Sequence, residues 1–135
     1  MKPLILVVDD NKDILLNIRI TLEQNNFEVI TSSNAQDALN ILSKTVKIPD
    51  VIVSDIMMPI IDGYDFFRKV SSSLKWSRIP FIFLTAKSSP EDVRFGKILG
   101  VDDYITKPFE EEDLLAIIKG KVHRKETIDS INKKI

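Results

Sequence analysis

The chain has 135 residues, which suits one compact domain, and its formal net charge of −1 gives no broad attraction to nucleic acid or to an anionic membrane. It has no cysteine, which excludes disulfides, thiolate metal sites and cysteine nucleophiles. No apolar run approaches the roughly 18 residues of a membrane-spanning helix and Leu4–Val8 is too short for a signal peptide, so we expect a cytoplasmic protein or the cytoplasmic part of a longer one.

Short β-rich runs alternate with helical patterns along the chain. The first run, Leu4–Val8, is apolar throughout, as expected for a strand buried on both faces. From Asn11, which suits an N-cap, apolar residues recur at helical spacing. Residues 27–31 (FEVIT) then predict a second strand, and Ser33 with Gln36 has the form of a capping box at the start of a second helix.

Three further strand–helix pairs follow. The strands are predicted at 50–55 (DVIVSD), 81–85 (FIFLT) and 103–106 (DYIT). Before the third helix, Asp62 and Gly63 are expected to form a turn in which the glycine supplies backbone freedom. Pro90 suits the first turn of the fourth helix and Gly100 its C-cap, and the acids of 110–113 suit the first turn of the fifth.

Five strand–helix units predict an α/β fold with a five-stranded parallel sheet and helices on both faces. Right-handed crossovers favour the flavodoxin-like, doubly wound strand order 2-1-3-4-5. Ligands of such sheets bind outside the carboxyl ends of the strands. Five polar residues occupy those ends in this sequence: Asp9, Asp10, Asp55, Thr85 and Lys107. We expect them to converge at one edge.

Crowded carboxylates need a cation nearby. Two unit charges ~5 Å apart at an effective dielectric of ~20 repel by roughly 3 kcal/mol. Mg²⁺ prefers oxygen ligands and is typically held by one or two carboxylates together with a substrate phosphate. Asp55 would then act as a carboxylate nucleophile that forms an acyl phosphate, with Lys107 and the Thr85 hydroxyl binding phosphoryl oxygens.

Four segments, in chain order, resemble the response-regulator receiver domain of two-component signalling, the CheY-like superfamily: VVDDN, SDIMMPIIDG, FLTA and DDYITKPF. The resemblance spans about residues 3–122. It implies that Asp55 accepts a phosphoryl group from the phosphohistidine of a histidine kinase or a histidine phosphotransfer protein. It also implies a signalling domain that catalyses only its own phosphorylation and dephosphorylation, not an enzyme acting on other substrates.

The resemblance also assigns the metal ligands. Asp10, Asp55 and the backbone carbonyl of Met57 would bind Mg²⁺ directly, and Asp9 largely through water. Mn²⁺ would substitute for Mg²⁺.

A switch is implied in the same way. Thr85 would move toward the phosphoryl group and Tyr104 would turn inward behind it, while a cis Lys107–Pro108 peptide sets the lysine. The surface formed by the fourth helix, the fifth strand and the fifth helix would then change and bind a partner or an output domain.

We place the receiver domain at residues 1–123. Residues 124–135 are expected to extend the last helix or to begin a linker. A frayed helical extension is the simpler interpretation. A signalling helix that leads to an output domain, or to a phosphorylation-dependent homodimer, is the alternative.

Other functions fit the residues less well. A phosphatase of the haloacid-dehalogenase kind needs an acid two positions after its nucleophile, where this chain has Met57. A flavin- or nucleotide-binding module would want a Gly/Ser/Thr-rich loop after the first strand, where this chain has DDNKD. A phosphate-independent receiver would be expected to lack part of the site. Because Met57 cannot orient an attacking water, we also expect slow self-dephosphorylation, which Lys87 would oppose by attracting the phosphoryl charge.

Overall fold

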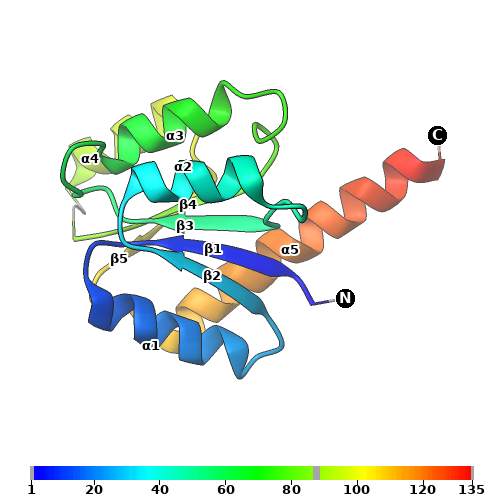
Figure 1. Ribbon diagram of the computed structural model, residues 1–135, viewed down its shortest axis with the longest axis horizontal. Helices are drawn as coiled ribbons and strands as arrows, with labels where there is room; N and C mark the ends of the chain where they lie inside the picture. The colour runs from blue at the N-terminus through cyan, green and yellow to red at the C-terminus, as the bar shows by residue number, and fades with distance from the viewer. Residues whose placement is uncertain (1, 87–88, 135) are drawn as a thin grey trace.

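A computed structural model describes residues 2–86 and 89–134, so Lys87 lies outside the described residues. Five strands form one parallel sheet in the order β2-β1-β3-β4-β5, which confirms the predicted fold class (Figure 1). The strands are β1 (Leu4–Val8), β2 (Glu28–Ser32), β3 (Val51–Ser54), β4 (Phe81–Thr85) and β5 (Asp103–Thr106). In register, Ile5 of β1 lies between Val29 of β2 and Val51 of β3.

Helices cover both faces of this sheet. They are α1 (Lys12–Glu23), α2 (Ala35–Lys44), α3 (Gly63–Ser71), α4 (Pro90–Leu99) and α5 (Glu111–Lys134). Helices α1 and α5 lie on one face, and α2, α3 and α4 lie on the other (Figure 1). Across the described residues, no helix is both long and apolar enough to cross a membrane.

Strand β1 contributes to a separate hydrophobic core on each face. Its side chains alternate: Ile5 and Val7 pack with α1 and α5, whereas Leu6 and Val8 pack with α2 and α3. All five residues of β1 are buried, which explains why its sequence is continuously apolar and not alternating. The charged residues that follow β1 are therefore carried on a fully buried strand that is paired on both sides.

The N-cap residues predicted from the sequence are correct for α1 and wrong for α2. Asn11 caps α1 as predicted, because its Oδ1 accepts the N–H groups of Asp13 and Ile14 at 3.0 and 3.2 Å. The prediction of Ser33 as the cap of α2 is wrong. Asn34 is the cap, and it forms a reciprocal pair with Asp37 in place of the expected pair with Gln36.

The start of α3 also differs from the prediction. Asp62 is the N-cap, with its Oδ1 accepting the Asp65 N–H at 2.9 Å, and Gly63 is the first helical residue instead of part of a turn. Both predictions for α4 are confirmed: Pro90 is its first residue, and Gly100 is its C-cap in the left-handed conformation with φ +92°.

Helix α5 is continuous to Lys134 and runs past the edge of the sheet (Figure 1). Its buried stripe consists of Leu114, Ile118 and Val122, at the spacing of one helical face. One turn later, Lys125 lies 3.2 Å from the Asp50 carboxylate, whose other oxygen accepts the Leu4 N–H. The first turn after the apolar stripe is thus still attached to the domain.

Candidate functional site

The carboxyl ends of four strands carry the predicted site residues. Asp9 and Asp10 follow β1, Asp55 follows β3, Thr85 ends β4 and Lys107 follows β5. Backbone hydrogen bonds continue the sheet through these positions: the Asp55 N–H donates to Val8 and the Lys107 N–H donates to Thr85, each at 2.9 Å. The structure therefore brings together residues that are up to about a hundred positions apart in the chain.

Three carboxylates form the centre of the site. Asp9, Asp10 and Asp55 each offer an oxygen atom, and these atoms all lie within 4.8 Å of one another. Asp9 and Asp55 are buried, whereas Asp10 is exposed. An all-oxygen donor set with one open side fits a hard divalent cation that keeps part of its water shell.

Lys107 contacts both buried carboxylates. Its Nζ lies 2.6 Å from Asp9 Oδ2 and 3.4 Å from Asp55 Oδ2. The remaining oxygens accept backbone donors: Asp9 Oδ1 binds the Asn11 N–H at 2.9 Å, and Asp55 Oδ1 binds the Ile56 N–H at 2.8 Å. Each buried carboxylate is thus fixed in orientation by one backbone donor and shares one ammonium group with the other.

The pKa of Asp55 is raised above its ordinary value. Burial is the largest cause and the negative charge of Asp9 is the second, while Lys107 and the Ile56 N–H lower the pKa by less. Lys107 and the Ile56 N–H therefore do not fully offset the cost of ionising the buried Asp55 beside Asp9. A bound cation would make up this deficit.

Removing the charge of Asp55 should stabilise the protein in the absence of divalent cations. In EDTA at neutral pH, we expect Asp55→Asn to raise the free energy of unfolding by about 1–2 kcal/mol, because the amide oxygen can still accept the Ile56 N–H. Asp10→Asn should raise it less, since Asp10 is exposed, and should also abolish Mg²⁺ binding. Thermal unfolding and Mg²⁺ titration measure these two effects.

The direction of the Asp55 pKa shift determines how the stability difference between Asp55→Asn and the unchanged chain depends on pH. Below the ordinary aspartate pKa of 3.8, Asp55 is protonated in both the folded and the unfolded chain. As the pH rises from this value to the raised pKa, the unfolded chain loses the proton before the folded chain does, and stability is lost. The advantage of Asp55→Asn should therefore grow as the pH rises above 3.8 and stay constant once the folded-state carboxyl is ionised. An unfolding temperature equal to or below that of the unchanged chain at neutral pH would contradict this explanation.

The loop after Asp55 is held close to the site by Gly63. The Gly63 N–H donates to the Ile56 carbonyl at 2.7 Å, and a Cβ atom at position 63 would lie 2.6 Å from the Ile56 Cα. Gly63 is needed for this close approach of two backbone segments, not for a turn. Met57 lies in the same loop with a largely exposed side chain, and the role of its carbonyl as a ligand stays a prediction.

Tyr104 packs against α4 behind the site. Its hydroxyl donates to the Asp92 carbonyl at 2.9 Å and its ring lies edge-on to Phe83, while burial raises the pKa of the hydroxyl. Gly96 makes room for the ring, because a Cβ there would lie 2.7 Å from the Tyr104 Cζ. Thr85 is fully buried at the end of β4.

The interpretation of the sequence missed Gly96, although one signal was present. A glycine inside a helix costs about 1 kcal/mol relative to alanine, so it usually has a packing reason.

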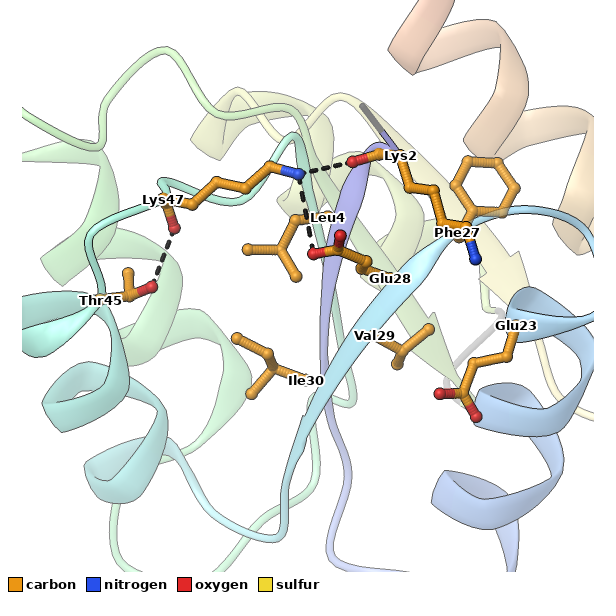
Figure 2. A pocket seen from close by; sticks show the side chains of 9 residues that line it. All are labelled: Lys2, Leu4, Glu23, Phe27, Glu28, Val29, Ile30, Thr45 and Lys47. Atoms are coloured by element: carbon orange, nitrogen blue, oxygen red, sulfur yellow. Dashed lines mark hydrogen bonds and ion pairs between the residues drawn. The ribbon is translucent and has the colours of Figure 1, made fainter.

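A hollow of about 410 Å³ lies at the opposite end of β1 and β2 (Figure 2). At its rim, Lys47 Nζ donates to the Lys2 carbonyl at 2.5 Å and lies 3.8 Å from Glu28 (Figure 2). None of the predicted site residues lines this hollow. It is therefore separate from the carboxylate site.

Comparison with known proteins agrees with the fold. The family model of the response regulator receiver domain matches residues 5–119. The response regulator SaeR of Staphylococcus epidermidis is 39% identical over 111 residues, covering 82% of this chain and 46% of that protein. The SaeR protein of Staphylococcus aureus (strain USA300) is 35% identical over 120 residues, covering 89% and 50%. This chain thus spans about half the length of these relatives.

A solved structure with 32% sequence identity has the same fold. The chemotaxis protein CheY4 of Vibrio cholerae superposes with a TM-score of 0.82 and 32% identity, covering 88% of this chain and 98% of that one. The matched family pattern includes the ends of all five strands. On these grounds, the chain belongs to the response-regulator receiver domain family of two-component signalling.

Proposed function

We propose that this receiver domain accepts a phosphoryl group on Asp55, in a Mg²⁺-dependent reaction, from the phosphohistidine of a histidine kinase or a histidine phosphotransfer protein. The observation that carries the proposal is the environment of Asp55. Asp55 is only 6% exposed, one carboxylate oxygen is fixed by the Ile56 N–H, and the other lies 3.4 Å from Lys107 Nζ. Such a group is oriented for attack and has a cation beside it.

In the proposed reaction, a carboxylate oxygen of Asp55 attacks the phosphorus atom. The new O–P bond forms as the N–P bond of the phosphohistidine breaks, and the imidazole nitrogen keeps that electron pair and takes a proton. Lys107 binds one phosphoryl oxygen, and the Thr85 hydroxyl binds another. The chain positions the reacting groups and balances charge, and Asp55 is the one residue that forms a covalent bond.

The carboxylate cluster fits the metal that this chemistry needs. Asp10, Asp55 and the Met57 carbonyl would hold Mg²⁺, or Mn²⁺ in its place, and Asp9 would bind through water. When bound, the ion neutralises charge on the carboxylates and on the phosphoryl oxygens. Lys107 already pairs with Asp9 at 2.6 Å, which supports an indirect role for Asp9.

Intact-mass measurement tests the proposal. The protein is incubated with acetyl phosphate and Mg²⁺, alongside an EDTA control and Asp55→Asn. We expect one phosphoryl adduct in the unchanged chain with Mg²⁺, and none in EDTA or in the variant. An adduct that persists in Asp55→Asn, or no adduct in the unchanged chain, would overturn the assignment.

For the output, we propose a population shift between two states of Thr85 and Tyr104. The Tyr104 hydroxyl is bonded to the Asp92 carbonyl of α4, so movement of this ring must break or remake a contact with that helix. This supports the surface of α4, β5 and α5 as the one that binds a partner or an output domain. A phosphorylation-dependent homodimer through this surface is the alternative, and the domain itself is not expected to bind nucleic acid.

We further propose that the receiver domain ends near residue 123 and that residues 124–135 extend the last helix or begin a linker. Val122 is the last α5 residue in the hydrophobic core, and this chain spans about half the length of its SaeR relatives. A cytoplasmic location is proposed with it, since a cysteine-free chain suits a reducing compartment.

The acyl phosphate should decay slowly. Met57, two residues after Asp55, has a 60% exposed side chain that offers no strong hydrogen-bond partner to an attacking water. We expect a lifetime of minutes or longer, and a shorter one in Met57→Asn, whose amide can orient water. Decay of radiolabelled protein after removal of the donor measures both lifetimes. Loss within seconds in the unchanged chain would contradict this expectation.

A further inference from the structure

The loop between β3 and α3 holds Ile60 in an unusual backbone conformation. Its φ is +71°, in the left-handed region that a β-branched residue rarely adopts. The conformation is imposed by a three-residue turn in which the Ile61 N–H donates to the Pro59 carbonyl at 2.9 Å. Asn26 also has a positive φ, but asparagine tolerates this region. Among the described residues, Ile60 is therefore the one whose β-branched side chain conflicts with a positive φ.

Packing does not compensate for this conflict. The Ile60 side chain is fully exposed, so the free domain gains no hydrophobic burial from it. Glycine or asparagine would remove the strain and suit the solvent better. An isoleucine that is strained and also exposed indicates that another molecule covers it, because strain of this kind gathers at binding and switch sites.

The position of Ile60 indicates what kind of molecule covers its side chain. Together with Pro59, Ile61 and Asp10, it lines a hollow of about 390 Å³ against the start of α2. Asp10 also belongs to the carboxylate cluster, so the hollow adjoins the mouth of the phosphorylation site.

Because Asp55 is only 6% exposed, a protein that delivers a phosphoryl group must insert its imidazole and rest the surrounding surface on this rim. Ile60 and the largely exposed Met57 are apolar residues that such a surface would meet.

We propose that Ile60 is an apolar anchor for the phosphohistidine-bearing domain, which seats an apolar side chain against Ile60 in the hollow beside Asp10. The proposal rests on the proposed function, because it assumes a protein donor for Asp55. A small donor does not cover the rim and makes no such contact. Ile60 therefore determines how well a protein donor is recognised and leaves the chemistry at Asp55 unaffected.

Three variants test this proposal. Ile60→Asn removes the strain and the apolar group, whereas Ile60→Val keeps both. Val46→Asn is the matched control, because Val46 is equally exposed in the loop before β3, at the opposite end of the sheet. The protein donor is the autophosphorylated histidine kinase that transfers fastest to the unchanged chain among the kinases of the source genome, and acetyl phosphate is the small donor.

We expect Ile60→Asn to raise the unfolding temperature by about 3 °C or more and to leave labelling by acetyl phosphate unchanged. Its kcat/KM for transfer from the kinase should fall about tenfold, through KM. Ile60→Val and Val46→Asn should transfer like the unchanged chain. Unchanged kinase transfer in Ile60→Asn, an equal loss in Val46→Asn, or no transfer from any kinase while acetyl phosphate still labels Asp55 would overturn the proposal. Failure of acetyl phosphate to label Asp55 would instead overturn the proposed function.

Discussion

Replacement of Lys107 by methionine is expected to slow phosphorylation of Asp55 by acetyl phosphate about 100-fold, a loss typical of removing one donor that stabilises the charge of a transition state. The Lys107 ammonium lies between Asp9 Oδ2 and Asp55 Oδ2, at 2.6 and 3.4 Å, and its side chain is 18% exposed. Methionine keeps the length of the stem and removes the charge. The pseudo-first-order rate of adduct formation in saturating Mg²⁺ measures the effect.

The same replacement should also destabilise the metal-free protein. Without Lys107, the buried carboxylates of Asp9 and Asp55 face each other with no ammonium group between them. Breaking a buried pair by removing one partner costs roughly 3–5 kcal/mol, and we expect a loss near 3 kcal/mol in EDTA because the pKa of Asp55 can rise further. Mg²⁺ should restore part of this stability by supplying the missing charge.

Two controls separate charge from geometry in this experiment. Lys107→Arg retains the charge and should recover most of the stability, but less of the rate, because a planar guanidinium cannot occupy the same point. Lys69→Met removes a charge from the exposed side of α3 and should change neither quantity. A Lys107→Met rate within threefold of the unchanged chain would show that the lysine does not contact the transferred group.

Gly63→Ala is the second replacement for which we expect a large effect. A Cβ at position 63 would lie 2.6 Å from the Ile56 Cα and 3.0 Å from the Asp55 carbonyl carbon, and neither backbone atom can move without moving the phosphorylation site. Overpacking against backbone typically costs about 1–3 kcal/mol, and we expect the upper end of that range. Denaturant unfolding measures the loss of stability.

Gly120→Ala is the matched control. Gly120 lies inside α5, and a Cβ there would meet nothing within 4 Å. This change should stabilise the protein by about 0.5–1 kcal/mol, since alanine is the better helix former. If Gly63→Ala were as stable as Gly120→Ala, the close approach of α3 to Asp55 would not be what requires a glycine.

The sheet order could be predicted because it depends on patterns that are repeated along the chain. Each strand appears as a short apolar run, and the crossover rule leaves few ways to connect five of them. The same rule places Asp9, Asp55 and Lys107 at one edge without any knowledge of side-chain contacts. Only the strand bounds shifted: β2 lies one residue later than predicted, and β3 is one residue shorter at each end. At the start of β3, the Asp50 side chain accepts the Leu4 N–H.

Features that depend on contacts between distant segments could not be predicted in this way. The purpose of Gly63 is visible only when α3 is placed beside Asp55, and that of Gly96 only when Tyr104 is placed against α4. The choice of Asn34 over Ser33 as a cap was a local ambiguity between two good capping residues. The strain at Ile60 arises from a turn whose φ the sequence does not specify.

The acceptor of the phosphoryl group can be located directly by chemical reduction. Borohydride reduces an aspartyl phosphate to homoserine, and peptide sequencing by mass spectrometry then locates the reduced residue. After treatment with acetyl phosphate and Mg²⁺, we expect homoserine at position 55 and unmodified aspartate at positions 9 and 10, because Asp55 itself carries the phosphoryl group. Homoserine at position 9 or 10, or none anywhere in a labelled sample, would contradict it.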